Sequence, residues 1–263
     1  MSQLRGVFTV VATPFKEDGA IDFDGFGNNL DFFVEKGGYG VCVAGTLGEY
    51  SAMTPEERKQ VFEFAAKRLD GRAPLMAGTI ATTTKQVIEL TKHVGDNGGE
   101  GVLLLSHPGL GLRPEELSTY YREVADATAV DIMLYNNPGS NGIDMQFDLV
   151  KELSEHPRIV AIKESSNDVK RITRIADELK GSLTPSAATK TCTSRRSVPE
   201  LKGGYAWAAT SHLNSFVTCW SLSRRAISTR HGSCPALTVL WRVISKARQN
   251  SFRPPNTSWT PSV

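Results

Sequence analysis

The chain has 263 residues, a formal net charge of +2 and 40% hydrophobic residues. This length suits one large domain with a full core, and α/β barrels commonly reach it. No apolar run approaches the ~18 residues of a membrane-spanning helix, and residues 1–6 lack the apolar core of a signal peptide. We therefore expect a cytoplasmic protein with no membrane partner.

The net charge averages two unlike segments. Residues 186–263 hold 11 of the 30 Lys and Arg residues but only one acidic residue, Glu200, so they carry +10 and residues 1–185 carry −8. All four tryptophans and three of the four cysteines also lie in residues 186–263, which we call the tail. The tail therefore differs in character from the segment before it.

Short apolar segments alternate with amphipathic segments through residues 1–184, at intervals of roughly 25–30 residues. The apolar segments lack strict alternation, which is typical of strands buried on both faces. They predict strands at Val7–Ala12, Gly40–Ala44, Pro74–Ala77, Gly101–Leu105, Asp131–Tyr135, Ile159–Lys163 and, more weakly, Ser182–Thr184. Helical patterns lie between them, near 24–36, 55–69, 84–97, 114–128, 147–155 and 168–180.

Strand and helix alternate at least six times, which implies parallel strands joined by right-handed crossovers. Both a (β/α)8 TIM barrel and an open, doubly wound sheet fit this pattern. Because no G-x-G-x-x-G sequence follows the first strand, the barrel is favoured. In such barrels the catalytic groups lie at the carboxyl ends of the strands.

The first candidate residue is Lys163, at the end of an apolar strand and followed by Glu164. A buried amine is costly as a cation, so this position favours a neutral amine that can attack a ketone and form an imine. The alternative is a strand-end lysine whose ammonium group reaches solvent.

The segment Gly45–Glu49 directly follows the second predicted strand. Its glycines, Gly45 and Gly48, flank Thr46 and Leu47, and this arrangement can turn successive N–H groups toward a carboxylate. The alternative is an ordinary tight turn between a strand and a helix.

Tyr135 ends the fifth predicted strand and begins the sequence Tyr135–Gly139. From that position its hydroxyl could exchange a proton with a reacting oxygen at the barrel mouth. The alternative is an aromatic side chain that only fills the end of the barrel.

In this order, each at a strand end, the three motifs resemble the dihydrodipicolinate synthase / N-acetylneuraminate lyase family over about residues 5–185. The resemblance implies a Schiff-base-forming lyase in which Lys163 reacts with the C2 carbonyl of pyruvate or another 2-keto acid. It implies Tyr135 as the proton relay, linked to the Thr46 hydroxyl, and Thr46 and the Leu47 N–H as carboxylate ligands. No metal or organic cofactor is implied, and relatives commonly form homo-tetramers.

The chain departs from the synthase pattern at three places. Ser140 occupies the position of an arginine used for a second substrate carboxylate, residues 106–110 replace a second tyrosine, and Leu47 replaces a second threonine of the glycine loop. An aldolase, hydratase-aldolase or dehydratase is therefore expected rather than the lysine-pathway synthase. His107 is a further candidate for proton transfer, although a loop histidine is usually structural or simply exposed.

Where the family continues with an acidic motif and two further barrel units, this chain has the Ser-, Thr-, Arg- and Trp-rich tail. A reading-frame slip near Pro185 explains this composition, because codons permitted for Ala187–Ser197, read one base earlier, yield an acidic family-like segment. We thus expect barrel units one to about seven in 1–185 and an out-of-frame tail in 186–263, with the last units incomplete and sheet edges exposed. The rival functions are an inactive product of a disrupted gene and a nucleic-acid-binding arm, for which the tail carries no recognised motif.

Overall fold

The computed structural model of the chain describes residues 4, 8–107, 110–187 and 205–209, and for 187 and 205–209 only the backbone. Residue contacts divide the chain into two units, Met1–Leu213 and Asn214–Val263, and all described residues belong to the first. No helix among them is long and apolar enough to cross a membrane.

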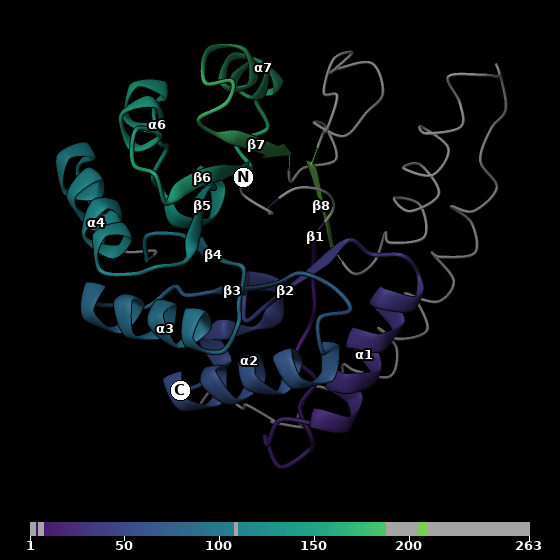
Figure 1. The fold of residues 1–263 in the computed structure, drawn as a ribbon. Coiled ribbons are helices and arrows are strands. Elements are labelled where there is room, and N and C mark those ends of the chain that lie inside the picture. The colour runs from purple at the N-terminus through teal and green to yellow at the C-terminus, as the bar shows by residue number, and fades with distance from the viewer. Residues whose placement is uncertain (1–3, 5–7, 108–109, 188–204, 210–263) are drawn as a thin grey trace, which may run out of the picture. The chain divides into compact units, whose positions relative to one another are not determined.

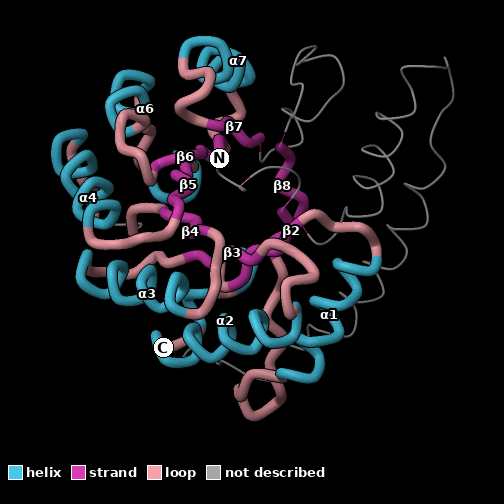
Figure 2. Tube along the Cα trace, viewed as in Figure 1, coloured by secondary structure: helices cyan, strands magenta, loops and turns pink. Residues whose placement is uncertain are grey.

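Eight parallel strands, hydrogen-bonded in chain order, form a closed barrel. Their bounds are β1 Phe8–Val10, β2 Gly40–Val43, β3 Leu75–Gly78, β4 Gly101–Leu104, β5 Asp131–Asn136, β6 Ile159–Glu164, β7 Thr184–Ala187 and β8 Tyr205–Ala209. The strands lie at the centre of this unit with the helices outside them (Figures 1 and 2). The predicted TIM barrel is therefore confirmed.

Six longer helices follow the first six strands, with short helical turns between some of them. Their bounds are α1 Phe23–Glu35, α2 Pro55–Leu69, α3 Thr84–Asp96, α4 Pro114–Asp126, α6 Phe147–Leu153 and α7 Val169–Glu178, with the shorter η1 Thr46–Gly48, η2 Tyr50–Ala52 and α5 Pro138–Asn141. Helix α2 begins at Pro55, where the helical pattern near 55–69 starts, and a capping box precedes it: Glu57 N donates to Thr54 Oγ1 at 3.2 Å, and Thr54 N donates to Glu57 Oε2 at 2.8 Å.

The expectation of exposed sheet edges is wrong for the strands that are described. Strand β8 pairs with β7 and with β1, and this closes the sheet. A skewed composition does not prevent backbone pairing, because a ladder uses N–H and C=O groups that every residue except proline supplies. Any helix following β7 or β8, and the tail cysteines, lie outside the described residues.

Apolar side chains fill the barrel interior. The cluster consists of Leu4, Phe8, Val10, Cys42, Met76, Ile80, Leu103, Leu105, Met133, Tyr135 and Ala161. At its base, a Cβ on Gly40 would lie 2.6 Å from the Phe8 ring, so glycine there leaves room for the aromatic side chain. The barrel is thus a packed core whose polar chemistry is confined to the strand ends.

Candidate active site at the mouth of the barrel

Lys163 and Tyr135 occupy paired positions on neighbouring strands, β6 and β5. Both side chains are buried, at 8% and 7% exposure, and the Lys163 Nζ lies 3.9 Å from the centroid of the Tyr135 ring. Tyr135 and Ala161 belong to the interior cluster, and strand alternation puts Lys163 on the same face as Ala161. The amine is therefore held against the phenol inside the barrel.

The loop after β2 lies in an unusual backbone conformation. Ala44 and Glu49, at either end of Gly45–Gly48, have φ of 50° and 59°, a region that non-glycine residues rarely occupy. The Gly48 N–H donates to Gly45 O at 2.9 Å and the Glu49 N–H to Thr46 O at 3.2 Å. Within the described part of the chain, the N–H groups of Thr46 and Leu47 donate to no acceptor, so this loop offers two successive donors to an anion.

The expected link between Thr46 and Tyr135 is absent from the described residues. The Tyr135 hydroxyl instead accepts a hydrogen bond from Asn137 Nδ2 at 2.9 Å, while the Thr46 side chain is exposed. Asn137 belongs to the segment 135–139, but no role was predicted for it. Nothing local in the sequence indicates that its amide turns back toward the phenol.

A buried arginine binds the carboxyl end of the neighbouring strand β3. Arg58, on α2, is 7% exposed and donates to Gly78 O at 2.7 Å and to Ile80 O at 2.6 Å. Burial lowers its pKa to about 10. A Cβ at Gly78 would lie 2.5 Å from Ala44 O, so the end of β3 lies directly against residues 44–49, which we call the β2 loop. The conformation of that strand end therefore affects the β2 loop. Sequence reasoning missed Arg58, which there looks like a surface residue of an amphipathic helix.

A buried polar pair joins the same two strands on their outer face. Asn136 and Glu164, the residues after Tyr135 and Lys163, are fully buried. Asn136 Nδ2 donates to Glu164 Oε1 at 3.1 Å and to Oε2 at 3.0 Å. This cross-strand contact fixes the spacing of the strand ends that carry the amine and the phenol.

Two further polar side chains lie near the amine. Ser186 on β7 pairs in register with Lys163, is fully buried, and its Oγ has no hydrogen-bond partner among the described residues. Cys42, inside the barrel, has a thiol whose pKa is raised to about 12 by burial, with an opposing effect from the nearby Lys163 charge. Ser186 is the first residue of the tail, and the sequence predicted no function for it.

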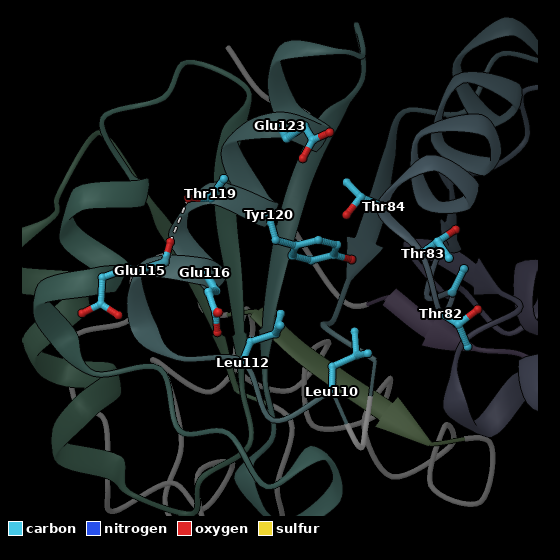
Figure 3. Close-up of a pocket in the computed structure, with 11 residues that line it drawn as sticks. Thr82, Thr83, Thr84, Leu110, Leu112, Glu115, Glu116, Thr119, Tyr120 and Glu123 are labelled. Atoms are coloured by element: carbon cyan, nitrogen blue, oxygen red, sulfur yellow. Dashed lines mark hydrogen bonds between the residues drawn. The ribbon is translucent and has the colours of Figure 1, made fainter.

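A separate pocket of about 570 Å³ lies where the start of α3 faces α4. Figure 3 shows Thr82, Thr83 and Thr84 on one side of it and Glu115, Glu116 and Glu123 on the other. It is lined by none of the predicted site residues, and its carboxylates would oppose the binding of a keto acid. The barrel mouth therefore remains the candidate active site.

The protein is a parallel barrel that carries, at its strand ends, a buried lysine, a tyrosine and a turn with two N–H groups that have no acceptor among the described residues. The model of the dihydrodipicolinate synthetase family matches residues 3–189, and the chain belongs to this family. The resemblance seen in the motifs is thereby confirmed.

The similar proteins are synthases and relatives of the same family. A 4-hydroxy-tetrahydrodipicolinate synthase of Stenotrophomonas maltophilia is 41% identical over 169 residues, which cover 64% of this chain and 57% of the relative. Dihydrodipicolinate synthase from Bacillus anthracis superposes with a TM-score of 0.79 at 26% identity, over 86% of this chain and 77% of that one. The E. coli protein YagE, solved in complex with pyruvate, gives a TM-score of 0.76 at 27% identity, over 85% and 76% of the two chains.

The chain spans 57% to 60% of the length of the curated relatives it matches. The match to the family model, over residues 3–189, includes Lys163 and Tyr135. The remainder of those relatives has no counterpart in the alignment with this chain.

Proposed function

We propose that this chain is a Schiff-base-forming lyase acting on pyruvate or another 2-keto acid. The observation that carries the proposal is the position of Lys163 Nζ, buried inside the barrel 3.9 Å from the centre of the Tyr135 ring. Family membership supports it, and so does the pyruvate complex of YagE, a similar protein.

In the proposed reaction the Lys163 amine attacks the C2 carbonyl carbon and forms a carbinolamine. Loss of the former carbonyl oxygen as water leaves a protonated imine, which withdraws electrons from C3 and from the C3–C4 bond. Tyr135 carries protons to the leaving oxygen and away from C3. The N–H groups of Thr46 and Leu47, with Gly45 and Gly48 shaping the turn, hold the substrate carboxylate, and no cofactor takes part.

We favour an aldolase, hydratase-aldolase or dehydratase over synthase activity. Ser140, in place of the arginine, is an exposed residue of α5 and cannot make the same bidentate contact with a second carboxylate. Incubation of the protein with pyruvate and a panel of aldehydes, and separately with 4-hydroxy-2-keto acids, would identify the net reaction.

Trapping with pyruvate and borohydride tests the covalent step. We expect a carboxyethyl adduct on the peptide that contains Lys163, lost in Lys163→Ala and retained in Lys170→Ala, a change of a lysine at the start of α7. If millimolar pyruvate gives no adduct on the unmodified chain, the proposal fails and the inactive product of a frame-shifted gene replaces it.

We further propose that the tail, residues 186–263, is translated out of frame, and that the enzyme is cytoplasmic. Resequencing the gene across the codons for residues 182–190 tests the frame: an inserted or deleted base is expected there. An intact frame would overturn this part.

The homo-tetramer expected from relatives can be checked by light scattering. A salt-sensitive interaction with DNA or RNA that is lost on deletion of 186–263 would favour the nucleic-acid-binding function instead of the lyase.

A further inference from the structure

The Tyr135 hydroxyl has one defined side-chain partner among the described residues. Asn137 Nδ2 donates to it at 2.9 Å from two residues further along the chain. An amide NH₂ group can only donate, and a phenol oxygen has one proton and lone pairs that accept. The Tyr135 proton therefore cannot be directed at the Asn137 nitrogen.

The carbonyl of Asn137 is held in place by hydrogen bonds from the next residues of α5. Its carbonyl accepts from Ser140 N at 2.9 Å and from Asn141 N at 3.1 Å, which closes the turn of α5. The Asn141 side chain, 9% exposed, reaches the same carbonyl at 2.7 Å with its amide nitrogen. In that orientation of the amide, the Asn141 oxygen is the atom that lies 3.3 Å from the hydroxyl of the buried Ser106, and it accepts from that hydroxyl. These contacts join Asn137 to the end of β4.

We propose that Asn137 is a positioning residue that aims the Tyr135 proton at the reacting atoms. The inference rests on the proposed function, because it assigns the orientation of the proton relay in that reaction. The Asn137 amide donates to one side of the phenol oxygen, so the O–H, which lies in the plane of the ring, takes the other in-plane direction, away from Asn137.

The orientation matters in the step that forms the imine. The Tyr135 proton moves to the carbinolamine oxygen, the C2–O bond breaks with its electron pair, water leaves, and the nitrogen lone pair forms the C=N bond. The phenolate that remains keeps the Asn137 N–H as a charge-assisted donor. It then accepts a proton from C3, which gives the enamine and restores the phenol.

The test compares Asn137→Asp, which has the same shape but only accepts, with Asn137→Leu, which neither donates nor accepts. Asn28→Asp, at an exposed position on α1, is the matched control for the change of charge. Activity is measured as deuterium exchange into the pyruvate methyl group, which needs no second substrate. The direction of the phenol hydrogen bond is measured by the tyrosine doublet in ultraviolet resonance Raman spectra, as the difference from Tyr135→Phe.

In Asn137→Asp the Raman signal of Tyr135 is expected to change from acceptor to donor, and kcat for exchange to fall about 10- to 100-fold. KM for pyruvate is expected to stay within about threefold, because the carboxylate ligands are untouched. Asn137→Leu should lose the acceptor signal with a smaller fall in kcat, and Asn28→Asp should match the unmodified chain.

An unchanged Raman signal in Asn137→Asp, or equal kcat in all three variants, overturns the assignment. A fall seen only in KM overturns it as well, since that would make Asn137 a binding residue. The Raman measurement needs no pyruvate, so failure of the proposed lyase reaction, seen as no borohydride adduct on the unmodified chain, is distinguished from failure of this inference.

Discussion

Replacing Asn136 by leucine tests how firmly the ends of β5 and β6 are tied together. Asn136 is fully buried, and its Nδ2 donates to both oxygens of the buried Glu164 and to Asp144 Oδ1 at 3.0 Å. Its Oδ1 accepts from Met145 N at 3.0 Å. Leucine has a similar size, so it removes these polar contacts while leaving little cavity.

Two losses set the size of the effect on the free energy of unfolding. The hydrogen bond from Asn136 to the charged Glu164 contributes about 1.5–3 kcal/mol. The Met145 N–H loses its acceptor, and a buried N–H without an acceptor costs about 1–3 kcal/mol. Glu164 keeps the Ser166 N–H at 2.7 Å and the Arg171 guanidinium at 3.8 Å, so its charge is not stranded. We therefore expect Asn136→Leu to lower the free energy of unfolding by about 3–5 kcal/mol.

Urea unfolding followed by far-ultraviolet circular dichroism measures this change, because all four tryptophans, at 207, 220, 241 and 259, lie in the tail and would report on it instead. Asn28→Leu, exposed on α1, is the control and is expected to shift the free energy by less than about 0.5 kcal/mol. Glu164→Gln alone and combined with Asn136→Leu completes a double-mutant cycle, with a coupling of about 1.5–3 kcal/mol expected. A loss below about 1 kcal/mol in Asn136→Leu would refute the argument that this pair ties the strands.

Three further changes follow from the same geometry. Gly78→Ala should raise KM for pyruvate with little change in helix content, because its Cβ would meet Ala44 O at 2.5 Å and displace the β2 loop. Unchanged deuterium-exchange kinetics would contradict this. Ser186→Ala should leave the free energy of unfolding unchanged or raise it by up to about 1 kcal/mol, because it deletes a buried hydroxyl that has no partner among the described residues. It should nevertheless weaken pyruvate trapping on Lys163, with which Ser186 pairs in register. A marked loss of stability would show that the hydroxyl is already hydrogen-bonded. The Cys42 thiol, with its pKa raised to about 12, stays protonated at pH 8, so peptide mass spectrometry should find it unalkylated in the folded chain and alkylated in urea, and rapid labelling without denaturant would disprove its burial.

Local chemistry explains why most of the helices and strands were predictable. The capping sequence at Thr54 and the proline after it locate the start of α2 at Pro55, as the structure has it. Buried parallel strands are short apolar runs, so β1 to β6 fall within or beside the predicted segments. Strand β7 was placed about two residues early, because Thr184–Ala187 contains a proline and little apolar character.

The short helix α5 and strand β8 escaped prediction for different reasons. Four residues are too few to show a helical period. Helix α5 depends instead on the hydrogen bonds that the buried Asn141 makes with Asn137. Strand β8 lies within a segment whose composition suggested out-of-frame translation. Its pairing with β1 and β7 is a long-range contact that a local pattern does not encode.

Most of the strands and helices, the strand ends that bear Lys163, Tyr135 and Thr46, and the family could be inferred without coordinates, because periodicity, caps and motifs are properties of neighbouring residues. The partner of the Tyr135 hydroxyl became known from the folded chain, in which Asn137 and not Thr46 donates to it. Folding also brought Ser186 beside Lys163 and Arg58 onto the end of β3. Such contacts depend on strand register and barrel closure, which place atoms within ångströms of each other across long stretches of chain.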